Sequence, residues 1–84
     1  MGRHSVEREL ALFVIESVEK YTAVPSATDA ERAGVCTRAV AWRYYRAWLK
    51  AGMLSRPFGE NSNTIAPGHN WAMLKYVDGK PKTK

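Results

Sequence analysis

The chain begins with apolar residues that recur at helical spacing. A helix that starts after Ser5 would carry Glu7 and Glu9 in its first turn, where carboxylates favour the helix dipole. Five apolar residues that recur three or four positions apart form its expected buried side: Leu10, Phe13, Val14, Val18 and Tyr21. Because Leu12 and Ile15 widen this surface, we expect the helix to pack under a later hairpin or to form a dimer interface.

The segment after this helix contains the signals that end one helix and start another. Pro25 disfavours the helical conformation of the residue before it. A second, short helix is expected from about Thr28 to Ala33, with Ser26 or Thr28 as its N-cap. Gly34 would end that helix in the left-handed conformation that glycine adopts easily.

A third helix is predicted from Thr37, its expected N-cap, to about Lys50 or Ala51, and Gly52 would end it. At about 100° per residue, one side is expected to face the core: Val40, Tyr44, Ala47, Trp48 and Ala51. The broad opposite side combines rings with cations: Arg38, Trp42, Tyr45, Arg46 and Leu49, flanked by Ala39, Arg43 and Lys50. Leu49 fits that exposed side poorly, so we expect it to pack under the hairpin.

After Gly52 the pattern becomes strand-like. Residues 53–58 and 71–77 are read as two strands, joined by a polar loop over 59–70 that is rich in Gly, Asn, Ser and Pro. Because Pro57 cannot donate a ladder hydrogen bond, the first strand should be short or lie at an edge. The predicted fold class is therefore mainly α with a small β-hairpin.

Length and composition fit one small domain. The 84 residues are 45% hydrophobic and 25% charged, so we expect a single folded domain over 1–79 and a disordered basic tail over 80–84. No apolar run approaches the ~20 residues of a membrane-spanning helix, and a cytoplasmic location is expected. With Cys36 as the one cysteine, neither an intramolecular disulfide nor a cysteine zinc site is available.

Charge is distributed unevenly along the chain. The formal net charge is +5, and no acidic residue occurs between Glu31 and Glu60. Six cations fall in that interval: Arg32, Arg38, Arg43, Arg46, Lys50 and Arg56. Such a stretch favours an anionic partner such as nucleic acid, although a solvated basic face has the same pattern.

Two motifs in this basic stretch resemble a known family. The segment "DAERAGVCTRAV", residues 29–40, resembles the helix-turn-helix of bacterial and phage DNA-binding proteins. Ala30 is small enough for close helix approach, Gly34 suits the turn, and Val35 and Val40 are apolar anchors. The segment "WLKAGML", residues 48–54, resembles the end of the recognition helix in winged-helix regulators.

This resemblance implies a winged helix-turn-helix fold that binds double-stranded DNA. It assigns base-edge contacts to Thr37, Arg38 and Trp42, and phosphate contacts to Arg43, Arg46 and Lys50. The wing would contribute further polar contacts to DNA, from Arg56, Asn61 and Asn63. An equally good explanation of the polar loop is that it is simply solvated.

The resemblance favours a bacterial or phage transcriptional regulator, with a homodimer expected through the first helix. Within the same class lies a phage recombination or packaging factor. An alternative from another class is a protein-interaction module with Trp42, Tyr45 and Leu49 as its contact patch. We expect no enzyme, cofactor, metal or small-molecule ligand, because His4, His69 and Cys36 are too few and too scattered for a catalytic set.

Overall fold

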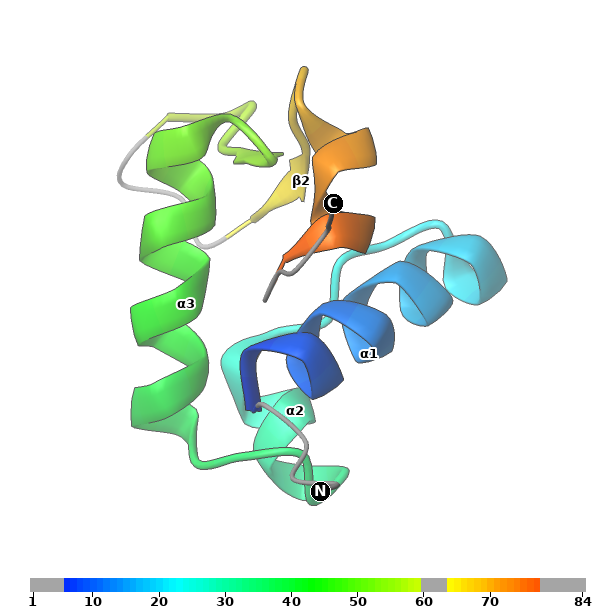
Figure 1. Ribbon diagram of the computed structural model, residues 1–84, viewed down its shortest axis with the longest axis vertical. Helices are drawn as coiled ribbons and strands as arrows, with labels where there is room; N and C mark the ends of the chain where they lie inside the picture. Colours follow the sequence, from blue (N-terminus) through cyan, green and yellow to red (C-terminus); the bar gives the residue numbers. More distant parts are fainter. Residues whose placement is uncertain (1–5, 60–63, 78–84) are drawn as a thin grey trace.

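A computed structural model describes residues 6–59 and 64–77 of the protein (Figure 1). Three α-helices come first: α1 (Val6–Tyr21), α2 (Ala27–Arg32) and α3 (Arg38–Ala51). A two-stranded antiparallel sheet and a 3-10 helix follow: β1 (Leu54–Ser55), β2 (Ala66–Pro67) and η1 (Trp71–Tyr76). The predicted class, mainly α with a small β-hairpin after the third helix, is confirmed. Three of the sequence predictions, namely the Ser5 cap, the loop residues Asn61 and Asn63, and the tail over 80–84, fall outside the described residues.

The helices α1 and α3 form opposite sides of the molecule. In Figure 1, α3 runs along the left side, α1 crosses on the right, and α2 lies near the lower end of both. The hairpin and η1 lie at the other end, between α1 and α3, and η1 packs against α1. None of the helices in the described ranges is long and apolar enough to cross a membrane.

The core lies where these elements meet. Its buried residues come from every helix and from β1: Leu10, Ala11, Val14, Ala27, Ala30, Ala41, Tyr45, Trp48, Leu54 and Leu74. Tyr45 and Trp48 are the largest of them, and their ring centroids are 5.8 Å apart. The three alanines of α2 and α3 let these helices approach closely, so that the two rings fill the space between α3 and its neighbours.

The expected buried side of α1 is correct at its centre and wrong at its end. Leu10 and Val14 are fully buried, and Phe13 and Val18 are half-buried, but Tyr21 is 70% exposed. Tyr21 is exposed because the helix stops there: the next residue, Thr22, has a φ of +56°, and the chain turns away toward α2.

A side-chain cap begins α2 and a glycine turn ends it. Ser26 is its N-cap; its Oγ accepts the N–H of Asp29 at 3.1 Å, and an Asp29 carboxylate oxygen accepts the N–H of Ser26 at 3.1 Å. Gly34, with φ +80°, ends the helix: its N–H donates to the Glu31 carbonyl and the Val35 N–H donates to the Ala30 carbonyl, both at 3.0 Å. Of the two expected caps, Ser26 is therefore the one used.

The ends of α3 follow the same rules. Thr37 Oγ1 accepts the N–H of Val40 at 3.3 Å, which makes Thr37 the N-cap as expected. Gly52, with φ +85°, ends the helix, and the Met53 N–H donates to the Trp48 carbonyl at 2.9 Å.

The expected core side of α3 was correct at Trp48, which is fully buried, but its other members are not, and the buried side lies about 100° around the helix from the expected one. The buried residues are Ala41, Tyr45 and Trp48. Tyr44 and Val40 are half-buried, and Ala47 and Ala51 are exposed. The buried side differs from the expected one because the Tyr45 hydroxyl has a buried hydrogen-bond partner. Tyr44 instead lies at the edge of the core, with its ring stacked 6.2 Å from that of Trp48.

The hairpin is smaller than expected, and its second strand is different. Leu54 pairs with Pro67 and Ser55 with Ala66, so β1 ends before Pro57, as that proline predicted. Residues 71–77, expected as the second strand, form the 3-10 helix η1 instead. The reason is a period of three in burial: Leu74 is buried, and Trp71 and Val77, three positions on either side, are half-buried.

Candidate nucleic-acid interface

The exposed side of α3 carries cations separated by small residues. Arg43, Arg46 and Lys50 are exposed, and their spacing of three and four positions places them on one side of the helix over two turns. Ala39 and Ala47, also exposed, fall on the same side. Because α3 contains no acidic residue, nothing on the helix itself offsets this positive charge.

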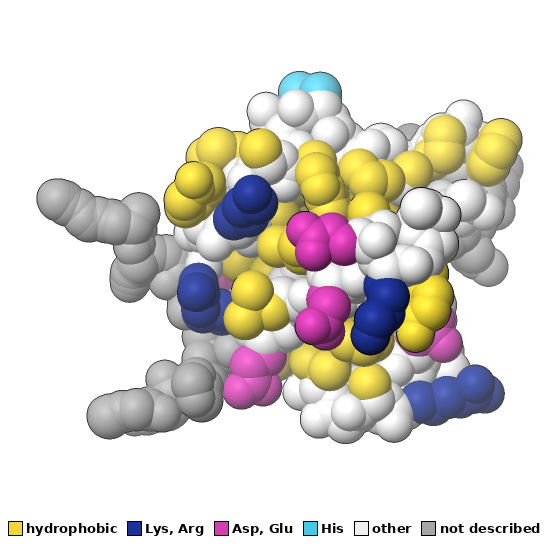
Figure 2. Space-filling model, turned by 90° about the vertical axis from the view of Figure 1, so that its right-hand side faces the viewer, with side chains coloured by type: hydrophobic (Ala, Val, Ile, Leu, Met, Phe, Trp, Pro, Cys, Tyr) yellow, Lys and Arg dark blue, Asp and Glu magenta, His cyan; other side chains and the backbone are white. Residues whose placement is uncertain are grey.

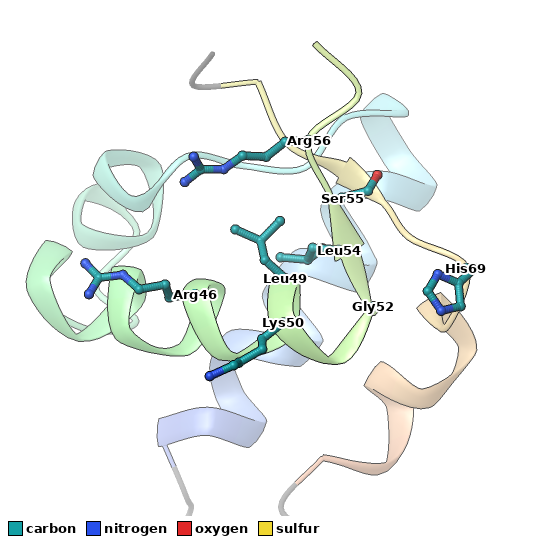
Figure 3. A pocket seen from close by; sticks show the side chains of 8 residues that line it. All are labelled: Arg46, Leu49, Lys50, Gly52, Leu54, Ser55, Arg56 and His69. Carbon is teal, nitrogen blue, oxygen red and sulfur yellow. The ribbon is translucent and has the colours of Figure 1, made fainter. Parts of the chain in front are cut away.

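A hollow of about 660 Å³ separates the C-terminal half of α3 from the hairpin (Figure 3). Its lining combines three cations and a histidine with two leucines and small residues: Arg46, Leu49, Lys50, Gly52, Leu54, Ser55, Arg56 and His69. Figure 3 shows that Arg46, from α3, and Arg56, from the segment after β1, extend in the same direction on either side of Leu49. Leu49 is half-buried at the base of this hollow, under the hairpin as expected.

Arg56 is held over α3 by an aromatic ring. Its guanidinium carbon lies 5.8 Å from the centroid of the Trp42 ring, a distance typical of a cation–π contact. Trp42 is half-buried and meets the Tyr45 ring edge to face, with centroids 6.1 Å apart. Trp42 therefore links a cation of the hairpin to the core side of α3.

Hydrogen bonds to backbone carbonyls attach the hairpin and η1 to the end of α3. Asn70 donates twice there: its backbone N–H to the Gly52 carbonyl at 2.8 Å, and its side-chain Nδ2 to the Ala51 carbonyl at 2.9 Å. The Gly68 N–H donates to the Met53 carbonyl at 2.9 Å. A Cβ on Gly68 would collide with the backbone oxygen of Gly52, so this close approach requires glycine.

The sequence-predicted site residues fall into separate groups. Arg43, Arg46 and Lys50 share the exposed side of α3, and Arg46 and Lys50 meet Arg56 at the hollow. Arg38 and Trp42 line a different hollow, of about 420 Å³, next to the start of α2 and Ile65. Thr37 stands apart because its hydroxyl oxygen already caps α3.

Tyr45, predicted on the exposed side with Trp42 and Leu49, is fully buried. Its hydroxyl donates to the Pro25 carbonyl at 2.8 Å, and burial raises the pKa of Tyr45 above its ordinary value. The sequence did contain a signal for this, because Ala41, Tyr45 and Trp48 recur at positions four and three apart. The Trp42–Tyr45–Leu49 contact patch is therefore incorrect as an exposed surface.

The residues that the structure describes contain no group of three His, Cys, Asp or Glu that could hold a metal ion. Cys36 is half-buried in the turn before α3, and burial, together with the nearby Glu31 carboxylate, raises the pKa of its thiol. A raised pKa keeps the thiol protonated and makes it a poor nucleophile.

No protein-family model matches this chain, and no curated protein or solved structure matches it either. The molecule is thus defined by its own geometry as a small, mainly helical domain with a short two-stranded antiparallel sheet after α3.

Proposed function

We propose that the protein binds double-stranded DNA, with the exposed side of α3 in the major groove and the hairpin against the sugar-phosphate backbone. The observation that carries this proposal is the side of α3 that presents Arg43, Arg46 and Lys50 without any acidic residue on the helix. Cations in such a row neutralise phosphates and displace counterions, which is the main source of affinity for DNA.

The alanines on this side of α3 favour binding within a DNA groove rather than against a flat surface. A major groove about 12 Å wide admits one α-helix. Ala39 and Ala47 would let the helix axis approach the bases, while the longer arginines reach sideways to phosphates or to guanine edges. Arg38, exposed in the first turn, lies where recognition helices contact bases, whereas Trp42 supports Arg56 from the side.

The order of elements supports a winged helix-turn-helix protein, because α2, a glycine turn, α3 and a hairpin follow one another. In this proposal the protein is a bacterial or phage transcriptional regulator that acts in the cytoplasm by occupying its site. A phage recombination or packaging factor would use the same surface. The alternative, a protein-interaction module that uses Trp42, Tyr45 and Leu49, is not supported by an exposed patch at these residues, because Tyr45 is fully buried.

The test is a fluorescence-anisotropy titration with random-sequence duplex DNA at about 50 and about 200 mM salt. The variant Arg43→Ala/Arg46→Ala removes two of the exposed cations of α3. Its matched control, Lys20→Ala/Lys75→Ala, removes the same charge from exposed positions of α1 and η1. We expect tight binding at low salt, and a loss of affinity with a shallower salt dependence in the α3 variant only, by about one unit of slope per lost phosphate contact.

Two results would contradict the proposal. One is the absence of binding at low salt by a protein whose circular dichroism shows a folded helical domain. The other is an equal loss of affinity in both double variants, since binding would then depend on net charge and not on α3.

A further inference from the structure

The hollow between α3 and the hairpin gathers cations from two separate segments of the chain. Arg46 and Lys50 enter its lining from α3, and Arg56 enters it from the segment after β1. None of the described residues that line it is acidic. On the side of the molecule that α1 forms, by contrast, acidic, basic and hydrophobic side chains are mixed (Figure 2). The charge of the hollow therefore does not merely reflect the net charge of the chain.

Two leucines give this hollow an apolar floor. Leu54 is 1% exposed and Leu49 is half-buried, and both belong to the lining. Charges of one sign around an apolar floor concentrate their field, so an anion is attracted more strongly here than beside isolated surface cations. The volume of about 660 Å³ leaves room for a phosphate group with the sugars on either side of it.

Trp42 fixes the position of the cation that the hairpin supplies. Trp42, Arg46 and Lys50 are four residues apart and therefore lie in one row along α3. The guanidinium of Arg56 lies over the Trp42 ring, with its carbon 5.8 Å from the ring centroid. Trp42 itself does not line the hollow. Its ring therefore holds Arg56 over α3 without occupying the space beside Arg46.

We propose that the hollow binds a single phosphate group between Arg46 and Arg56, and that Trp42 is the positioning residue that holds Arg56 there. Guanidinium groups donate paired hydrogen bonds to phosphate oxygens, and the two arginines extend in the same direction on either side of Leu49 (Figure 3). Lys50 adds a third positive charge to the lining. The inference rests on the proposed function where the phosphate comes from the DNA backbone, and a free phosphate ion has the same chemistry.

The salt dependence of DNA binding reports whether the two arginines share one phosphate, because each neutralised phosphate adds about one unit to its slope. Anisotropy titrations with duplex DNA, between about 50 and about 200 mM salt, compare two double variants. Arg46→Gln/Arg56→Gln removes both arginines of the hollow. Arg43→Gln/Arg56→Gln is the matched control, because Arg43 is exposed on α3 and does not line the hollow. We expect the first variant to lose about one unit of slope and the control to lose about two.

The role of Trp42 is tested by removing the ring without changing the charge. Trp42→Leu should bind duplex DNA about threefold more weakly, and Trp42→Phe, which keeps an aromatic ring, should recover part of that loss. When Arg56 is already replaced by glutamine, Trp42→Leu should have no further effect on DNA affinity. An equal loss with and without Arg56 would mean that Trp42 acts only on the fold, and would overturn its positioning role.

Inorganic phosphate tests the hollow without DNA. The probe is sodium phosphate, titrated at constant ionic strength into isotope-labelled protein and followed by the NMR shifts of the backbone amides. A hollow that accepts the free ion should show shifts at Lys50, Gly52 and Arg56 that are absent from Arg46→Gln/Arg56→Gln. A one-unit loss of slope with DNA but no shifts with phosphate would identify the DNA backbone as the source of the phosphate.

The outcomes separate this inference from the proposed function. If the wild-type protein binds DNA and both double variants lose two units of slope, the shared phosphate is overturned while DNA binding stands. If the protein does not bind DNA but phosphate shifts the amides of the hollow, the proposed function fails and the phosphate site stands. If neither DNA nor phosphate binds, both are overturned.

Discussion

Replacing Tyr45 with phenylalanine removes a single oxygen atom from the centre of the fold. The Tyr45 side chain is fully buried, and its hydroxyl donates to the Pro25 carbonyl at 2.8 Å. Tyr45→Phe keeps the ring and its contacts with Trp42 and Trp48. It leaves the carbonyl of a buried proline without this donor, so the loss reports the hydrogen bond and not the packing.

The expected cost follows from that burial. Leaving a buried acceptor unsatisfied costs about 1–3 kcal/mol of unfolding free energy. In a domain of 84 residues, each 1 kcal/mol lowers Tm by about 4–8 °C. Thermal and urea unfolding at pH 7, followed by circular dichroism, should therefore show Tyr45→Phe melting at least about 4 °C below the wild-type protein.

The neighbouring tyrosine supplies a matched control. Tyr44 is half-buried and stacks on Trp48, and its hydroxyl makes no hydrogen bond among the residues that the structure describes. Tyr44→Phe should change the unfolding free energy by less than about 0.5 kcal/mol. Equal losses of unfolding free energy in the two variants, or no loss in Tyr45→Phe, would refute the conclusion that the Tyr45 hydrogen bond stabilises the packing of α3 against the α1–α2 connection.

The same pair of variants predicts a pH dependence. Burial raises the pKa of Tyr45 above its ordinary value of 10.0. Below pH 10 the phenol is protonated in both the folded and the unfolded state, and stability does not depend on it. As the pH rises above 10, the unfolded state releases the proton while the folded state keeps it, so stability falls by up to about 1.4 kcal/mol per pH unit. Tyr45→Phe should lack this loss, whereas Tyr44→Phe should retain it.

Three further substitutions test other features of the fold by urea unfolding. Thr22→Gly should raise the unfolding free energy by about 1 kcal/mol, because it relieves a β-branched residue with φ +56°; an unchanged or lower stability would contradict that strain. Gly52→Ala should cost about 2 kcal/mol or more, because its φ is +85° and a Cβ would lie 2.6 Å from the His69 ring; a neutral result would mean that α3 ends differently. Glu7→Ala should lower the unfolding free energy by about 1 kcal/mol, because the 3.1 Å hydrogen bond from Trp48 Nε1 is lost. An unchanged unfolding free energy would show that this bond is not made in solution.

Features set by local chemistry were predictable from the sequence. Ser26 and Thr37 cap helices through their own side chains, and Gly34 and Gly52 end helices because of their own backbone freedom. Each depends on residues within a few positions of the chain. Pro57 limited β1 for the same kind of reason.

The orientation of α3 was not predictable in this way. Rings occupy positions 42, 44, 45 and 48, so apolar periodicity alone left more than one side of the helix as a candidate core. Two distant partners decide between them: Pro25 accepts from Tyr45, 20 residues away, and Glu7 accepts from Trp48, 41 residues away. The correction moved Tyr45 out of the candidate surface and brought Ala47 into it, while Arg43, Arg46 and Lys50 kept their exposed positions.

The exposed carboxylates of α1, Glu9, Glu16 and Glu19, test how far charge acts across this molecule. The helices α1 and α3 lie on opposite sides of a molecule whose smallest extent is 24 Å (Figure 1). Exposed charges are screened over about 10 Å at 0.1 M salt. The three carboxylates should therefore neither repel DNA from α3 nor reduce the attraction of Arg43 and Arg46 for phosphates. The variant Glu9→Gln/Glu16→Gln/Glu19→Gln should thus bind duplex DNA with nearly wild-type affinity at about 0.1 M salt. A large gain in affinity would place these acidic residues much closer to the DNA than this geometry allows.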